Sequence, residues 1–166
     1  MINRRSILIL LIFLTLLATF LFLASLYFQF IENLEPCPLC IAQRVALFFL
    51  AISYFIALFV KKNILKKLNT FAQFFFAIFG TIMASRQVWL MHIPPSEQSG
   101  CMPDLSVLWN YLPFLDLVRV FFNGTASCTE NAWSWLGVSM PEWTLVFFVF
   151  FIFASILLCY FRQKLK

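Results

Sequence analysis

Four long apolar stretches constrain this chain more than any other feature. They cover residues 6–31, 45–60, 68–85 and 143–161, and none of them contains a charged side chain. A helix needs roughly 20 apolar residues to cross the hydrocarbon core of a bilayer. Because 63% of the residues are hydrophobic and only 11% are charged, a soluble domain of this size could not bury its apolar surface. The sequence therefore predicts an all-α integral membrane protein, built as a four-transmembrane-helix bundle.

The expected organisation is a single membrane domain over residues 1–166. Its spans are predicted at about 7–28, 42–60, 69–90 and 143–161, with loops at about 29–41 and 92–142. The second apolar stretch is short by count, and it becomes long enough if residues 41–43 join the helix and Arg44 extends toward the interface. Residues 105–122 of the long second loop are rich in leucine, valine and aromatic side chains, which predicts a short interfacial helix there.

Basic and acidic residues fall on opposite sides of the predicted spans. Nine of the twelve basic residues flank one side: Arg4, Arg5, Lys61, Lys62, Lys66, Lys67, Arg162, Lys164 and Lys166. All seven acids lie on the other: Glu32, Glu35, Glu97, Asp104, Asp116, Glu130 and Glu142. Since lysine and arginine near span ends stay on the cytoplasmic side, both termini are expected to be cytoplasmic. The net charge of +5 reflects these membrane anchors and does not indicate nucleic-acid binding.

Four of the five cysteines lie in the two non-cytoplasmic loops. Cys37 and Cys40 stand in the short first loop, and Cys101 and Cys128 stand in the longer second one. Disulfides persist on the oxidising side of a membrane. Pairing within each loop needs no rearrangement and gives one tight and one wide pair. Cys159, near the cytoplasmic end of the last span, is expected to act as a small apolar filler.

The tight pair forms the motif Cys37-Pro38-Leu39-Cys40. Such a pair stores two electrons as a dithiol and releases them when it becomes a disulfide. A position just before a helix stabilises a thiolate, so Cys40 is expected to be the more acidic thiol. Arg44 lies one turn further on, where its charge would favour an anion at Cys40 or on a reduced quinone oxygen. The alternative is an arginine that only extends to the interface.

Two other polar residues lie near the same predicted interface. His92, the only histidine, follows the third span, and it could donate a hydrogen bond to a quinone carbonyl or be an ordinary interfacial residue. Arg86 lies deeper in that span, where charges are functional suspects by default. No role for Arg86 follows from the sequence.

The chain resembles the bacterial disulfide bond formation protein B (DsbB) family over essentially its whole length. The residues that carry the resemblance are Tyr27-Phe28-Gln29, Pro36-Cys37-Pro38-Leu39-Cys40-Ile41, Gln43-Arg44, Ala46-Leu47-Phe48, Gln87 with His92, and Cys128 followed by Trp133, Leu136-Gly137, Met140-Pro141 and Trp143. A Cys-x-x-Cys motif alone is weak, but this ordered set together with four spans is specific. The Pro-Leu dipeptide between the first two cysteines departs from some members of the family.

The resemblance implies an enzyme of the bacterial inner membrane, with its active cysteines on the periplasmic side. It would reoxidise a soluble DsbA-like dithiol oxidase and pass the electrons to ubiquinone or menaquinone. By analogy, the partner attacks the Cys101–Cys128 disulfide at Cys101. Cys128 then attacks Cys37 and releases Cys40 as a thiolate beside the quinone, Arg44 and His92. Exchange of this kind proceeds through mixed disulfides, so its cysteines must come within reach of one another.

Three other readings of the cysteines stay open at the level of sequence. Both pairs could be inert structural disulfides. The four sulfurs could bind zinc, although the oxidising compartment and the wide spacing of the second pair argue against a metal. A transporter of reducing power is the third reading, but it would need reactive cysteines accessible from both faces of the membrane.

Overall fold

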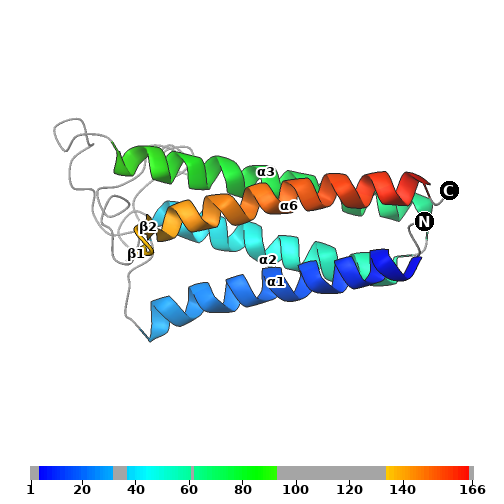
Figure 1. Ribbon diagram of the computed structural model, residues 1–166, viewed down its shortest axis with the longest axis horizontal. Helices are drawn as coiled ribbons and strands as arrows, with labels where there is room; N and C mark the ends of the chain where they lie inside the picture. The colour runs from blue at the N-terminus through cyan, green and yellow to red at the C-terminus, as the bar shows by residue number, and fades with distance from the viewer. Residues whose placement is uncertain (1–3, 32–36, 61, 93–133, 165–166) are drawn as a thin grey trace, which may run out of the picture.

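The computed structural model describes residues 4–31, 37–60, 62–92 and 134–164. Four helices, α1 (Arg4–Phe30), α2 (Pro38–Phe59), α3 (Asn63–Met91) and α6 (Met140–Lys164), lie side by side along one axis (Figure 1). All four are long and apolar enough to cross a membrane. The expected all-α, four-helix membrane protein is therefore confirmed.

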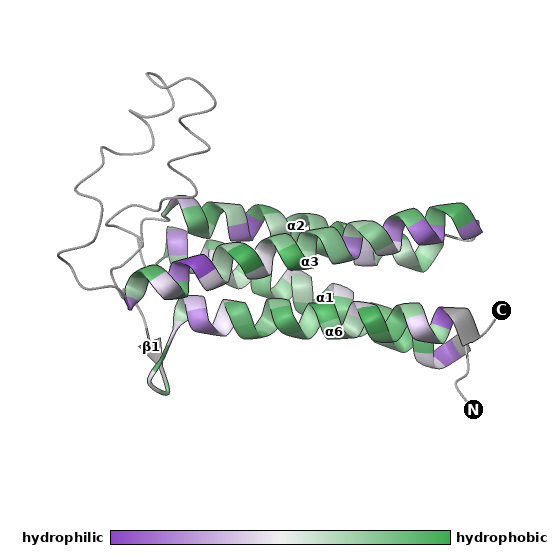
Figure 2. Cartoon of the chain, turned by 90° about the horizontal axis from the view of Figure 1, so that it is seen from above, coloured by the Kyte–Doolittle hydropathy of each residue, from purple (hydrophilic) through white to green (hydrophobic). Residues whose placement is uncertain are grey.

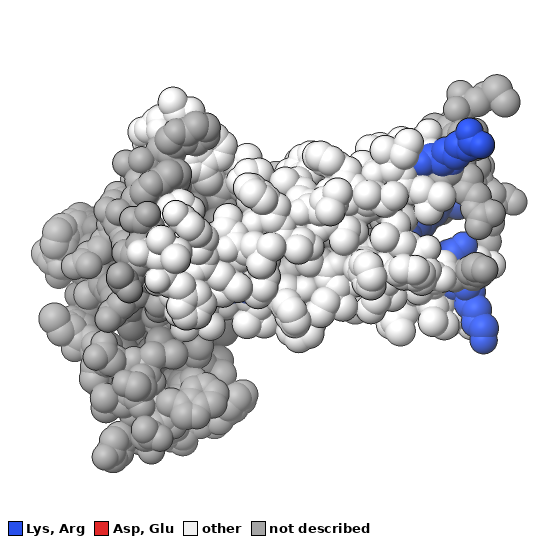
Figure 3. Space-filling view, turned by 90° about the horizontal axis from the view of Figure 1, so that it is seen from below, with Lys and Arg blue, Asp and Glu red and all other residues white. Residues whose placement is uncertain are grey.

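Polar residues concentrate toward the two ends of the bundle, while its middle is mostly hydrophobic (Figure 2). The start of α1, the α2–α3 connection and the end of α6 meet at one end, where lysine and arginine side chains gather (Figure 3). The start of α2 and the end of α3 lie at the opposite end, which we call the cysteine end because it carries Cys37 and Cys40. The assignment of the basic end to the cytoplasm stays a prediction.

All four helices start three to six residues before the predicted spans, since the predictions followed apolar runs and polar residues continue the helices. Helix α1 continues to Phe30 and α2 begins at Pro38, so the loop expected at 29–41 was wrong at both ends. Pro38 occupies the first turn, where its missing N–H needs no partner, and Cys37 caps the helix. Helix α3 begins at Asn63 because Lys66 and Lys67 are good helix formers.

A small hairpin that the sequence reading did not predict precedes α6. Strands β1 (Ser134–Trp135) and β2 (Val138–Ser139) pair antiparallel, joined by Leu136 and Gly137 with φ of 56° and 78°. Two consecutive positive φ values are typical of a tight two-residue hairpin turn. The Ser139 backbone N–H and hydroxyl donate to the Glu142 carboxylate at 2.6 and 2.7 Å. Glu142 thereby bonds back to the backbone N–H of the residue before the helix, as the glutamate of a capping box does, and α6 starts at Met140 rather than 143.

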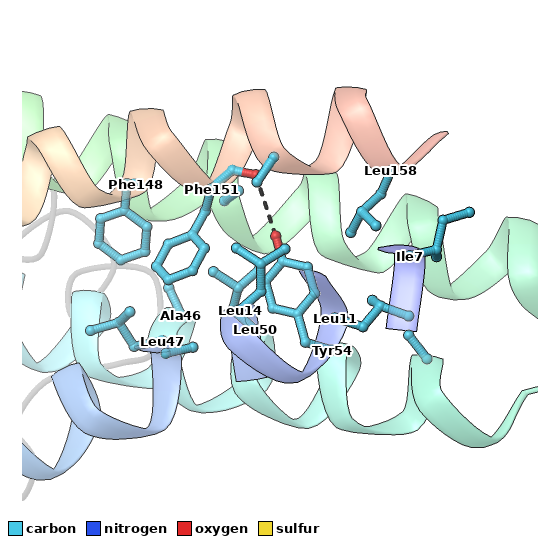
Figure 4. Close-up of a cluster of buried hydrophobic side chains, with 14 of the residues drawn as sticks. Ile7, Leu11, Leu14, Ala46, Leu47, Leu50, Tyr54, Phe148, Phe151 and Leu158 are labelled. Atoms are coloured by element: carbon cyan, nitrogen blue, oxygen red, sulfur yellow. Dashed lines mark hydrogen bonds between the residues drawn. The ribbon is translucent and has the colours of Figure 1, made fainter. Parts of the chain in front are cut away.

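The core lies between α2 and the helices around it. Tyr54 of α2 is fully buried, and its hydroxyl lies 2.8 Å from the Ser155 hydroxyl of α6 (Figure 4). Leu14 of α1 and Phe151 of α6 pack into the same cluster. Hydrogen bonds between helices matter in a bilayer because lipid offers no alternative partner to a hydroxyl.

The outer surface of the bundle is apolar. Large hydrophobic side chains are exposed along all four helices, among them Phe20, Phe55, Phe71 and Phe153. A soluble protein rarely exposes so continuous an apolar surface, whereas lipid tails solvate it. The interfacial helix expected within 105–122 lies outside the described residues.

Candidate functional site

The Cys37–Cys40 pair forms the N-terminus of α2. Cys37 is the N-cap, and its Sγ accepts a hydrogen bond from the Cys40 backbone N–H at 3.3 Å. The two sulfur atoms lie 3.0 Å apart. Cys37 is 4% exposed and Cys40 is half-buried, so Cys40 is the more accessible of the two.

This geometry suits reversible oxidation. A disulfide has an S–S distance of about 2.05 Å, so the two sulfurs need to approach by only about 1 Å to bond. The first-turn N–H groups of α2 and its dipole favour a negative charge at this position. The helix therefore holds the sulfurs together and stabilises the thiolate that thiol exchange requires.

Gln87 of α3 places its amide against both sulfurs. Its Nε2 lies 3.2 Å from Cys40 Sγ and 3.6 Å from Cys37 Sγ. Its Oε1 also lies within reach of Cys40 Sγ, at 3.6 Å. The Gln87 side chain is buried, with 4% of its surface exposed. A neutral residue on a neighbouring helix thus contacts the reacting atoms directly.

A chain of hydrogen bonds joins Gln87 to two further helices. Gln43 of α2 donates from Nε2 to Gln87 Oε1 at 2.8 Å. Thr144 of α6 lies with its hydroxyl 3.0 Å from Gln43 Oε1. The chain Thr144–Gln43–Gln87 therefore connects α6, α2 and α3 to the cysteine pair.

Arg44 joins α2 to α1 at the same end of the bundle. Its Nη2 donates to the Ser25 carbonyl at 2.9 Å, and its Nη1 donates to Gln29 Oε1. Its charge interacts electrostatically with Cys40 and, less strongly, with Cys37. These contacts hold Arg44 inside the bundle, next to the cysteines, so it is more than an arginine extended toward the interface.

His92 ends α3 at the cysteine end, where its side chain is exposed. Its Nδ1 lies 2.8 Å from the Val88 carbonyl, which can only accept, so Nδ1 carries a proton. The neutral ring therefore presents Nε2 as an acceptor. It can donate to a quinone carbonyl, as the sequence reading expected, only when the ring carries a second proton. Glu142 of α6 interacts with His92 electrostatically.

The structure thus brings three of the six predicted site residues together: Cys37, Cys40 and Arg44. His92 lies at the same end of the bundle, but the described residues show no contact between it and the pair. Cys101 and Cys128 lie outside the described residues.

Sequence reasoning gave no role to Gln29, Gln43 or Gln87, although all three stood in the family motifs. A glutamine within or next to a predicted span was the available signal, because polar groups at membrane depth need partners.

Arg86 and Cys159 interact with neighbouring residues on their own helices. The guanidinium carbon of Arg86 lies 4.4 Å from the centre of the Trp89 ring on the same helix, a cation–π contact. Cys159 interacts with the charge of Arg162 near the basic end of α6. Within the described ranges no three His, Cys, Asp or Glu side chains cluster as metal ligands.

Comparison with known proteins agrees with the motifs. The family described as Disulfide bond formation protein DsbB matches residues 4–158. Proteins named disulfide bond formation protein B from Methylococcus capsulatus and Hahella chejuensis are each 38% identical to this chain, over 76% of it and 77% and 78% of their own lengths. Disulfide bond formation protein B 1 of Pseudomonas aeruginosa is 31% identical over 80% of this chain and 82% of its own. These matches confirm the resemblance, and the chain belongs to the DsbB family of disulfide bond formation proteins.

Proposed function

We propose that this protein is a protein-dithiol:quinone oxidoreductase, which reoxidises a DsbA-like periplasmic dithiol oxidase and passes the electrons to ubiquinone or menaquinone. The observation that carries the proposal is the Cys37–Cys40 pair, held 3.0 Å apart at a helix N-terminus with the Arg44 charge beside it. A disulfide-forming oxidoreductase role goes with the family.

Each turnover moves two electrons through a series of disulfides. The reduced partner attacks the Cys101–Cys128 disulfide at Cys101, and Cys128 leaves as a thiolate. Cys128 then attacks Cys37, which breaks the Cys37–Cys40 disulfide and leaves Cys40 as a thiolate. The second thiol of the partner attacks the partner–Cys101 mixed disulfide, which releases the oxidised partner and leaves Cys101 as a thiolate. Cys101 then attacks Cys128, which re-forms Cys101–Cys128 and releases Cys37, so that the two electrons reside in the reduced Cys37–Cys40 pair. Because each step exchanges one disulfide for another, the two electrons stay in the thiols until the Cys37–Cys40 disulfide forms again.

The residues at the cysteine end suit a quinone. A bound quinone would supply the acceptor for the two electrons and two protons that leave when the Cys37–Cys40 disulfide re-forms. Arg44 holds five N–H donors, of which the described contacts use two, so it keeps donors for an anionic oxygen. Neutral His92 offers Nε2 as an acceptor for a hydroxyl. These two residues are the ones we assign to quinone binding.

The proposed cellular location rests on the distribution of lysine and arginine residues. Most of the described lysine and arginine residues, apart from Arg44 and Arg86, gather at the end opposite the cysteines, as expected for a bacterial inner membrane protein whose cytoplasmic side is positive. In that orientation the cysteine pair lies at the periplasmic interface, where the partner would be found.

The test is quinone reduction by the purified protein in detergent, followed by quinone absorbance after addition of a reduced DsbA-like oxidase. Cys40→Ser should abolish quinone reduction while leaving Cys101–Cys128 able to form. The matched control is Cys159→Ser, a cysteine at the other end of the bundle, which should reduce quinone at the parent rate. Undiminished turnover in Cys40→Ser would overturn the mechanism.

A further inference from the structure

We propose that Gln87 donates the hydrogen bond that stabilises the Cys40 thiolate, and that Gln43 and Thr144 hold the Gln87 amide in the donating orientation. Gln87 contacts the reacting sulfur and is a catalytic residue in that sense, whereas Gln43 and Thr144 are positioning residues. The role of these three residues in catalysis rests on the proposed oxidase function, because quinone reduction requires a thiolate at Cys40.

The distances favour donation by the Gln87 amide. Nε2 lies 3.2 Å from Cys40 Sγ, 0.4 Å nearer than Oε1 at 3.6 Å. An amide nitrogen only donates, and a thiolate only accepts. A hydrogen bond to a charged group is stronger than one between neutral groups. The closer contact therefore stabilises the ionised form of Cys40 over the thiol.

Gln43 determines which end of the Gln87 amide faces the sulfur. Gln87 Oε1 accepts from Gln43 Nε2 at 2.8 Å. If the Gln87 amide turned over, two amide nitrogens would face each other, and both would lose an acceptor. Each glutamine side chain is only 4% exposed, so water is poorly placed to replace the lost partner. The orientation of Gln43 thus fixes the orientation of Gln87.

Thr144 determines the direction of the whole chain. Its single hydroxyl proton points either to Gln43 Oε1 at 3.0 Å or to the Pro141 carbonyl at 2.8 Å. With the proton on Gln43, every bond in the chain donates toward the sulfur. With the proton on Pro141, both amides can turn over, and Gln87 Oε1 then accepts from a Cys40 thiol. The two directions match the two protonation states of Cys40.

The experiment measures alkylation of the full-length protein in detergent, after reduction with dithiothreitol and its removal. Iodoacetamide reacts with thiolates, and mass spectrometry reports the rates at Cys40 and Cys159 separately. The variant is Gln87→Met, which keeps the side-chain length and removes the donor. The matched control is Gln73→Met, the same substitution at a fully buried glutamine of α3 whose described hydrogen bond goes to the Ser53 carbonyl.

At about pH 7, Gln87→Met should slow Cys40 alkylation about tenfold, which converts to about 1.4 kcal/mol. At about pH 10, where most ordinary thiols are ionised, the variant and the parent should converge. Gln73→Met should leave the Cys40 rate unchanged, and the Cys159 rate should be the same in all variants. Loosened packing would expose Cys40 and raise its alkylation rate, so it cannot mimic the expected slowing. An equal or faster rate at pH 7 overturns the proposal, as does a loss of rate that persists at pH 10.

The positioning role has its own test. Gln43→Met frees the Gln87 amide to take both orientations, so Cys40 alkylation at about pH 7 should slow about twofold. The double variant Gln43→Met/Gln87→Met should match Gln87→Met alone, because Gln43 acts only through Gln87. A further loss in the double variant would overturn the positioning role.

Gln43→Met also keeps the proposal testable if Gln87→Met does not fold. Alkylation needs neither quinone nor a protein partner. Slowed alkylation in a protein that never reduces quinone would therefore refute the proposed function and leave the role of Gln87 standing.

Discussion

At Gly80, helix α3 packs closely against Phe148 of α6, and adding one methyl group there tests the packing of the bundle. A Cβ at Gly80 would lie 2.1 Å from Phe148 Cε1 and 2.4 and 2.5 Å from two further atoms of the same ring. Ordinary contact begins at 3.4 Å, so the nearest atom is about 1.3 Å too close. Phe148 is 1% exposed and packed in the core cluster, so its ring has little room to move away.

The size of the effect follows from two opposing terms. Overpacking a well-packed core costs about 1–3 kcal/mol, and a clash with three ring atoms belongs at the upper end. Alanine is better than glycine inside a helix by about 1 kcal/mol, which offsets part of the cost. We therefore expect Gly80→Ala to lower the free energy of unfolding by about 2 kcal/mol.

The assay is unfolding in mixed micelles with increasing dodecyl sulfate, followed by tryptophan fluorescence. The decisive comparison repeats Gly80→Ala in a Phe148→Ala background, where the ring is gone. There the clash term vanishes and the propensity term remains, so the same substitution should stabilise the protein by up to about 1 kcal/mol. The change of sign isolates the contact. If Gly80→Ala were neutral or stabilising with Phe148 present, the close approach of α3 and α6 would be refuted.

Two further predictions concern Arg44 and His92, the residues assigned to quinone binding. Arg44→Lys keeps a positive charge but loses the forked guanidinium that bonds both Ser25 and Gln29, so the rate of quinone reduction should fall at least tenfold. Gln29→Leu leaves the bond between Arg44 and Ser25, so it should lower the rate only a few-fold. Equal losses in steady-state assays would contradict this ranking. At His92, an asparagine can replace Nδ1 and its bond to Val88, whereas a glutamine extends to the position of Nε2. If Nε2 contacts the quinone, His92→Asn should raise the KM for quinone several-fold and His92→Gln should not, and the opposite order would assign His92 a capping role only.

The fold was largely predictable because lipid simplifies the problem. Long runs without charge mark the spans, and every backbone group inside them must bond within its own helix. The ends were less predictable, since a helix does not stop where hydrophobicity stops. Two local signals would have corrected them: Pro38 at the start of α2 and the Ser139–Glu142 capping box at the start of α6.

The site was predictable only in part, and the reason is physical. Cys37, Cys40 and Arg44 lie within eight consecutive residues, so helix periodicity alone brings them together. Gln87 follows Cys40 by 47 positions, and its contact with the sulfur depends on how α3 is positioned against α2. Sequence spacing on one helix carries no information about such a contact.

Every described helix contributes to the hydrogen bonds around the cysteine pair. Gln87 comes from α3, Gln43 from α2 and Thr144 from α6, while Arg44 reaches across to α1. Since lipid cannot replace these partners, the Thr144–Gln43–Gln87 chain and the Arg44 contacts hold together only if all four helices keep their relative positions.

The packing at Gly80 therefore matters for chemistry as well as for stability. Gln87 lies seven residues beyond Gly80, two turns and about 10 Å along the same face of α3. Pushing α3 away from Phe148 would also move α3 relative to Thr144, four residues earlier on α6. Gly80→Ala should then slow Cys40 alkylation in the folded protein, whereas in the Phe148→Ala background, where the clash is absent, the same substitution should leave the Cys40 rate unchanged. A variant that loses stability but keeps the parent Cys40 rate would show that the bundle core and the site tolerate such shifts independently.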